Sequence, residues 1–134
     1  MIQLTDKPTL QDFHLEGVNH IAPEEAYHAV KSELAILLDI REEYEWNEKM
    51  DLTEVLYHPM SFIMDRLKHI PDDKTIVVIC AKGERSTKVA NLLNRQGFKS
   101  VANLDGGINE WKKQNLPMVS AGNSGCGCGC SCSG

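Results

Sequence analysis

Short runs of apolar residues recur along the chain, and amphipathic stretches separate them. The runs at 18–21, 35–38, 54–56, 75–79 and 100–103 predict strands. Continuous apolar runs such as 75–79 are typical of strands that are buried on both faces of a parallel sheet. Five strands alternating with helices predict an α/β fold in which helices cover both faces of one five-stranded parallel sheet, giving three layers.

The stretches that follow the strands carry helix signals. Pro23, Glu24 and Glu25 open the first helix, because proline suits the first helical position and acidic residues favour the first turn. Another helix begins at Ser86 and stops at Gly97, a residue type favoured just past a helix end. The residues that we expect to face inward from the four helices are Ala26 and Val30; Met60, Ile63, Met64 and Leu67; Val89, Leu92 and Leu93; and Ile108 and Trp111.

Composition excludes several function classes. A chain of 134 residues with 42% hydrophobic content is long enough for one domain with a real core. A net charge of −5 without a basic patch argues against nucleic acid as the main partner. No apolar run approaches the roughly 20 residues that span a bilayer, so we expect no membrane partner. No signal peptide is visible at the amino terminus, and we therefore expect a cytoplasmic location, where a reduced thiol persists.

Patterning divides the chain into three parts. Residues 1–17 are polar and weakly patterned, and we expect them to form an arm that lies on the domain. Residues 18–118 contain the strand and helix signals and form the predicted domain. Residues 119–134 are rich in glycine, serine and cysteine, a composition that predicts a flexible tail without a core.

The candidate chemistry lies where the strand 75–79 meets the helix that follows it. Cys80 ends the strand, and Gly83 can adopt the positive φ that a tight loop needs. Inward backbone N–H groups and the helix dipole favour the thiolate form of a cysteine at this position. A structural cysteine at a strand end would not explain the glycine and arginine around it. We therefore expect Cys80 to act as a nucleophile, with Glu84 pointing outward, and an anion-binding loop made of Ala81, Lys82, Gly83, Glu84, Arg85 and Ser86.

Three segments resemble the rhodanese family of sulfurtransferases. Residues 80–86 match the pattern Cys-x-x-Gly-x-Arg-Ser of the family's active loop. Residues 37–45 resemble its Asp-x-Arg element, and residues 104–111 resemble its closing Gly-Gly-x-x-x-Trp helix. The resemblance covers roughly residues 18–117 in the family's order and spacing. The region 46–73 departs from the family's Gly-His-Ile-Pro-Gly-Ala-like stretch, and it can therefore alter substrate choice.

The resemblance implies a strand order and a role for two charged residues. The family's order 3-2-4-5-1 makes the Cys80 strand central, with ligands beyond the carboxyl ends of the strands. Asp39 and Arg41 are implied to pin a strand end beside the active loop. The alternative for these two residues is a plain surface ion pair.

The activity that the resemblance implies is a two-step sulfur transfer without a required cofactor. The Cys80 thiolate takes the sulfane sulfur of a small anionic donor such as thiosulfate and releases sulfite. The resulting persulfide then gives its outer sulfur to a small thiol, to cyanide or to a protein thiol. Lys82 and Arg85 are expected to attract the donor.

The tail adds four cysteines at alternate positions, Cys126, Cys128, Cys130 and Cys132. A soft-metal site for Zn or Cu(I), a sulfur relay from Cys80 and no specific role all stay open for them. For the relay, the tail reaches the active loop easily if the domain ends on the same side as that loop, and it must stretch if the domain ends on the opposite side.

Other function classes compete with the transferase. Only four residues, 81–84, separate Cys80 from Arg85. Cysteine-dependent phosphatases use one more, so this loop is too small for a phosphate. A catalytically silent interaction module would most simply lack the cysteine. A non-enzymatic persulfide carrier, or a soft-metal-binding protein that uses the domain as a scaffold, remains an alternative.

Overall fold

Five parallel strands form the central sheet of the protein. The computed structural model describes residues 3–46, 48–52 and 55–120. The strands are β1 (Asn19–Ile21), β2 (Ala35–Asp39), β4 (Val55–Tyr57), β5 (Thr75–Ile79) and β6 (Val101–Leu104). Their spatial order is β1-β6-β5-β2-β4. Counted along the chain without β3, this is the expected order 3-2-4-5-1, which confirms that the strand before Cys80 is central.

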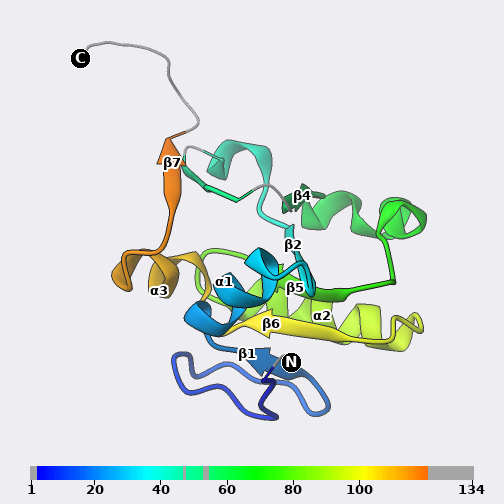
Figure 1. Cartoon of the computed structure of the whole chain (residues 1–134). Helices are drawn as coiled ribbons and strands as arrows, with labels where there is room; N and C mark the ends of the chain where they lie inside the picture. Colours follow the sequence, from blue (N-terminus) through cyan, green and yellow to red (C-terminus); the bar gives the residue numbers. More distant parts are fainter. Residues whose placement is uncertain (1–2, 47, 53–54, 121–134) are drawn as a thin grey trace.

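Helices cover both faces of this sheet (Figure 1). One face carries α1 (Pro23–Lys31) and α3 (Gly107–Lys113), and the other carries α2 (Glu84–Arg95) and the 3₁₀ helix η2 (Met60–His69). The three-layer α/β class is therefore confirmed. Within the described part of the chain, no helix has the length and apolar character needed to cross a membrane.

Strand β5 shows why its apolar run is continuous. Val77 and Ile79 pack in the cluster beneath α1 and α3, whereas Val78 and Cys80 pack in the cluster beneath α2. Successive side chains of a strand point to opposite faces, so a strand covered on both sides needs apolar residues at every position. All residues from Ile76 to Cys80 are buried.

A second, two-stranded sheet was not predicted from the sequence. Strand β3 (Glu48–Met50) pairs antiparallel with β7 (Met118–Ser120), so that Lys49 lies opposite Val119. The Trp111 indole N–H donates to the carbonyl of Pro117 at 2.9 Å and fixes the approach to β7. Each strand has three residues, which is too short for a periodic signal.

The prediction for Met64 is wrong. An α-helical spacing placed Met64 inward beside Ile63, but Ile63 is 3% exposed and Met64 is 56% exposed. The segment forms a 3₁₀ helix, η2, with about 3 residues per turn instead of 3.6. Met60 and Ile63 then share the inward face, and Met64 turns toward solvent.

The amino-terminal residues pack against the domain through polar contacts. Thr5 forms an antiparallel bridge with His20 at β1. The Asp105 carboxylate accepts hydrogen bonds from the backbone N–H groups of Thr9 at 2.8 Å and Leu10 at 3.0 Å. This segment therefore runs beside the turn that precedes α3, close to the end of β6.

Substitutions in η2 test the assignment of its faces. Ile63→Ala should lower the free energy of unfolding by about 2–4 kcal/mol, because it leaves a cavity beneath η2. Met64→Ala should change it by less than about 0.5 kcal/mol, since the side chain is exposed. Urea denaturation of both variants measures the difference. Equal losses would contradict the 3₁₀ register.

Candidate active site

Cys80 lies directly after β5, at the carboxyl edge of the sheet, and its side chain is buried (1% exposed). Its sulfur accepts hydrogen bonds from the backbone N–H of Gly83 at 3.1 Å and of Ser86 at 3.4 Å. Gly83 has φ +99°, which turns the loop back over the sulfur and starts α2. Two backbone donors at a helix start therefore point at Sγ, an arrangement that favours negative charge on the sulfur.

Helix α3 holds the other side of the loop. The N–H groups of Ile108 and Asn109 donate to the carbonyls of Cys80 and Ala81 at 2.9 and 3.0 Å. Gly107, at φ +66°, makes this approach possible, because a Cβ atom there would lie 2.6 Å from the Ala81 oxygen. The Gly-Gly turn thus brings the α3 backbone against the loop that begins with Cys80.

A buried polar network lies behind Cys80. The Ser86 hydroxyl is 3.3 Å from Sγ and donates to the side-chain carbonyl of Asn103. The Asn103 amide group donates to the side-chain carbonyl of Gln11 at 2.9 Å, and that same oxygen accepts from the N–H of Gly106. The Gly106 backbone therefore fixes both amide orientations. Consequently the Ser86 proton is directed to Asn103 and not to the sulfur.

Two histidines extend this network toward the arm. The Asn103 amide also donates to His20 Nδ1 at 3.0 Å, so His20 carries its proton on Nε2. That nitrogen donates to His14 Nδ1 at 2.8 Å. Burial, and secondarily the nearby His14, lower the pKa of His20. His20 therefore serves the network as a neutral ring, and its contact with His14 joins β1 to the amino-terminal residues.

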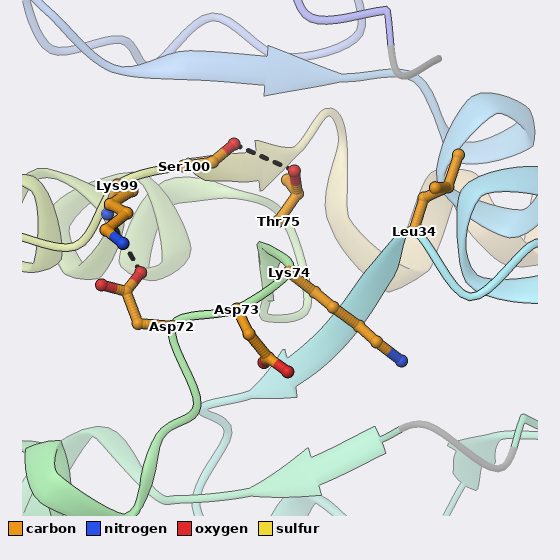
Figure 2. A pocket seen from close by; sticks show the side chains of 7 residues that line it. All are labelled: Leu34, Asp72, Asp73, Lys74, Thr75, Lys99 and Ser100. Atoms are coloured by element: carbon orange, nitrogen blue, oxygen red, sulfur yellow. Dashed lines mark hydrogen bonds between the residues drawn. The ribbon is translucent and has the colours of Figure 1, made fainter.

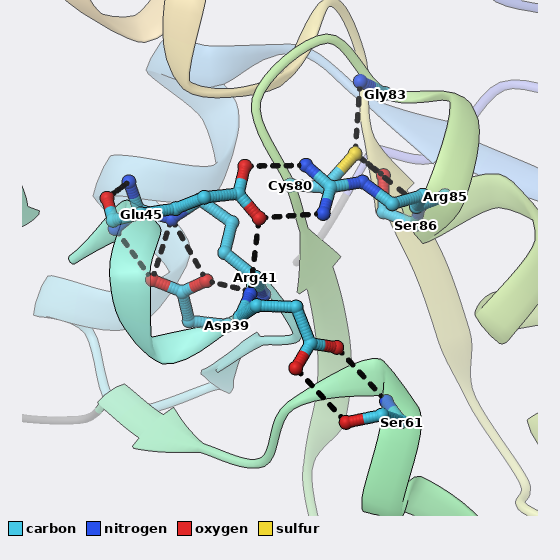
Figure 3. A network of polar contacts seen from close by, with 9 residues as sticks. Asp39, Arg41, Glu45, Ser61, Cys80, Gly83, Arg85 and Ser86 are labelled. Carbon is cyan, nitrogen blue, oxygen red and sulfur yellow. Dashed lines mark hydrogen bonds and ion pairs between the residues drawn. The ribbon is translucent and has the colours of Figure 1, made fainter.

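Arg85 faces Glu45 at the mouth of the site (Figure 3). Both terminal nitrogens of the guanidinium donate to the Glu45 carboxylate, at 2.6 and 2.7 Å. These hydrogen bonds hold the pKa of Glu45 below its ordinary value and raise that of Arg85. The cation expected to attract a donor is therefore already paired. Glu45 lies in the short 3₁₀ helix η1 (Glu43–Glu45) and is fixed there by the N–H of Glu42 at 3.0 Å.

Asp39 and Arg41 form a buried pair at the end of β2, so the surface-pair alternative is wrong. Their side chains are 1% and 6% exposed, with a shortest N–O distance of 2.9 Å. The Arg41 guanidinium also donates to the carbonyls of Glu45 and Glu48 at 2.9 and 2.8 Å. The pair thus supports the segment that carries Glu45, and Glu45 in turn contacts Arg85 of the active loop.

A cavity of about 440 Å³ opens over the sulfur. Lys82 and Glu84 lie exposed at its rim, and Glu84 is 3.7 Å from Lys88. The remaining loop residues, Gly83 and Ser86, are buried and hold the sulfur. The residues that line the cavity are Glu45, Cys80, Ala81, Lys82, Glu84 and Arg85.

Four of the site's residues could not be identified from the sequence: Gln11, Glu45, His20 and Asn103. Each is a single polar residue without a spaced partner, and the histidines carried no ligand spacing. Among the described residues there is no group of three or more His, Cys, Asp or Glu side chains placed to hold a metal. The four tail cysteines lie outside the described residues.

A second hollow of about 400 Å³ lies at the opposite ends of the strands (Figure 2). It is bordered by the residues that precede β2, β5 and β6, including Leu34, Asp72 and Lys99. Ligands of open α/β sheets bind beyond the carboxyl ends of the strands. This hollow lies at the amino ends of the strands and has no cysteine among its lining residues, so it is not the candidate active site.

Comparison with known proteins identifies the fold and its relatives. Residues 22–114 match the model of the rhodanese-like domain. A sulfurtransferase of Allochromatium vinosum is 37% identical over 89 residues, covering 66% of this chain and 82% of that protein. Thiosulfate sulfurtransferase GlpE of Actinobacillus pleuropneumoniae is 28% identical over 108 residues, which cover 79% of this chain and 97% of that protein. The crystal structure of a rhodanese-related protein from Thermoplasma volcanium has a TM-score of 0.66 at 27% identity, and the match covers 75% of this chain and 96% of that protein.

Gly107 provides a test of the contact between α3 and the active loop. Gly107→Ala should lower the free energy of unfolding by about 2 kcal/mol or more, because its Cβ strains the backbone and meets the loop carbonyls. Gly97→Ala is the matched control, since Gly97 also has positive φ but open space around it. It should cost about 1 kcal/mol. Urea denaturation measures both, and a milder effect at Gly107 than at Gly97 would refute the close packing.

Proposed function

Because the chain belongs to the rhodanese-like domain family, we propose that it is a sulfurtransferase that works through a persulfide on Cys80. The observation that carries this proposal is the pair of backbone N–H groups directed at the Cys80 sulfur beside an open cavity. Relatives that are named sulfurtransferases support it.

The first step transfers one sulfur atom from a donor such as thiosulfate. The Cys80 thiolate attacks the sulfane sulfur, a new S–S bond forms, and the S–S bond of thiosulfate breaks with its electron pair leaving on sulfite. The charge of the nucleophile passes to the outer sulfur of the persulfide. The N–H groups of Gly83 and Ser86 hold the sulfur of Cys80 in place during the attack.

The second step returns the enzyme to its thiolate form. An acceptor thiolate attacks the outer sulfur of the persulfide, and the Cys80–sulfur bond breaks with its electrons returning to Cys80. A small thiol, cyanide or a protein cysteine has the nucleophilicity that this step needs. Sulfite leaves before the acceptor binds, and free enzyme is regenerated only by the second half-reaction, so double-displacement kinetics are expected.

Replacement of the nucleophile tests this function. Cys80→Ser should form no sulfur adduct with thiosulfate or glutathione persulfide and should show no turnover, because a hydroxyl at this site stays protonated. Intact-mass measurement detects the adduct, and circular dichroism checks the fold. Sulfur transfer by the serine variant would exclude Cys80 as the sulfur-carrying residue. A wild-type protein that loads one sulfur without multiple turnovers would favour the non-enzymatic carrier instead.

The end of β7 favours the tail cysteines as an acceptor. Ser120 pairs with Glu48. The Arg41 guanidinium donates to the backbone carbonyls of both Glu48 and Glu45. Glu45 in turn contacts Arg85 of the active loop. The described chain therefore ends on the side that carries the active site. Cys126 follows six residues later, a span of at most about 20 Å, and so short a tether raises the effective concentration of the tail cysteines on this side of the domain.

Peptide mapping after limited thiosulfate loading tests this relay. The expected result is sulfur on Cys80 first and then on one of the tail cysteines, together with slower turnover after deletion of residues 121–134. Sulfur confined to Cys80 and unchanged turnover of the deleted protein would eliminate the relay. The full-length and deleted proteins also test whether the tail binds Zn or Cu(I). The measurement is the metal content of each protein after equilibration with each ion.

A further inference from the structure

We propose that Glu45 is a specificity-determining residue, which restrains Arg85 and biases the site against doubly charged sulfur donors. This inference rests on the proposed function and concerns the class of donor. The observation behind it is that the guanidinium expected to bind the donor is occupied by a carboxylate of the same cavity.

The charges around the cavity balance before any donor enters. Lys82 and Arg85 contribute positive charge, while Glu45 and Glu84 contribute the same amount of negative charge. A Cys80 thiolate makes the site negative. Thiosulfate carries two negative charges, so it meets repulsion from the nucleophile without a free arginine to offset that repulsion.

A donor with less charge does not meet this barrier. In an organic persulfide, RSSH, the Cys80 thiolate attacks the outer sulfur, and the S–S bond of the donor breaks. The leaving group is the thiolate RS⁻, and the proton stays on the transferred sulfur. Atoms and charge balance, and the donor approaches as a neutral molecule or a monoanion. The pairing of Arg85 with Glu45 therefore lowers kcat/KM for such a donor less than it lowers kcat/KM for thiosulfate.

The surrounding structure maintains the restraint on Arg85. Glu45 is held by the N–H of Glu42, and its backbone carbonyl is bound by the buried Arg41. Its carboxylate is thus presented to Arg85 by a rigid support, and it keeps its charge because Arg85 lowers its pKa. Both partners are nevertheless partly exposed, at 33% and 21% of their side-chain surface. Solvent weakens the pair enough for a substitution to change its balance.

The test compares donors in Glu45→Gln. The glutamine keeps an oxygen for the Glu42 N–H but releases the charge of Arg85. The kcat/KM for thiosulfate should rise about fivefold to tenfold, while that for cysteine persulfide, which is neutral or a monoanion, should stay within about twofold. The gain should shrink as salt is added, since it is electrostatic. Glu43→Gln is the matched control, because it removes the same charge from an exposed position of η1. It should leave both values within about twofold.

A double variant shows whether Glu45 acts through Arg85. In Arg85→Ala, the Glu45→Gln substitution should raise kcat/KM for thiosulfate by clearly less than it does in the wild-type protein, because only the direct repulsion by the Glu45 charge is then removed. A fall of kcat/KM for thiosulfate in Glu45→Gln, matching that of Arg85→Ala, would overturn the proposal and make Glu45 a residue that positions Arg85. An unchanged ratio between the two donors would also overturn it. If neither donor loads sulfur on Cys80 in the wild-type protein, the proposed sulfur transfer fails first, and the specificity proposal fails with it.

Discussion

The burial of the Cys80 sulfur at the end of a central strand constrains the structure around it. A polar atom removed from water needs hydrogen-bond partners, and the N–H groups of Gly83 and Ser86 provide them for the sulfur. The chain can present both only by turning sharply, which requires the left-handed conformation of Gly83. Helix α3 must then approach the loop carbonyls closely, and Gly107 allows this. The backbone at this edge of the sheet thus keeps the Cys80 sulfur buried and hydrogen-bonded.

The charged residues outside this cradle form two connected ion pairs with different properties. The pair of Asp39 and Arg41 is buried, so loss of either partner would leave an uncompensated charge in the interior. It forms a rigid base for the η1 segment. The buried pair contacts the pair of Glu45 and Arg85 through the Glu45 carbonyl. This second pair is partly exposed, and solvent screening makes it weaker. The buried pair therefore provides stable support, whereas the partly exposed pair carries the charge balance that a substitution can change.

The fold could be predicted from the sequence to the level of strands, helices and layers. The apolar runs identified the five strands of the main sheet, because a sheet covered on both faces leaves a continuous signal. The strand order came from the resemblance to a family and not from the pattern itself. The prediction failed at Met64, where a 3₁₀ helix replaced the assumed α-helical period. It also missed β3 and β7, whose pairing joins segments far apart in the chain.

The sequence by itself determined the local part of the site. The strand end, Cys80, the turn at Gly83 and the start of α2 lie within a few residues, and their backbone conformation follows from those residues. Only the tertiary structure decided the partners of the side chains. Gln11 meets Gly83 across 72 residues, and Glu45 meets Arg85 across 40. Such contacts leave no local signal, because the order of the strands and the course of the amino-terminal segment bring the groups together only after the chain has folded.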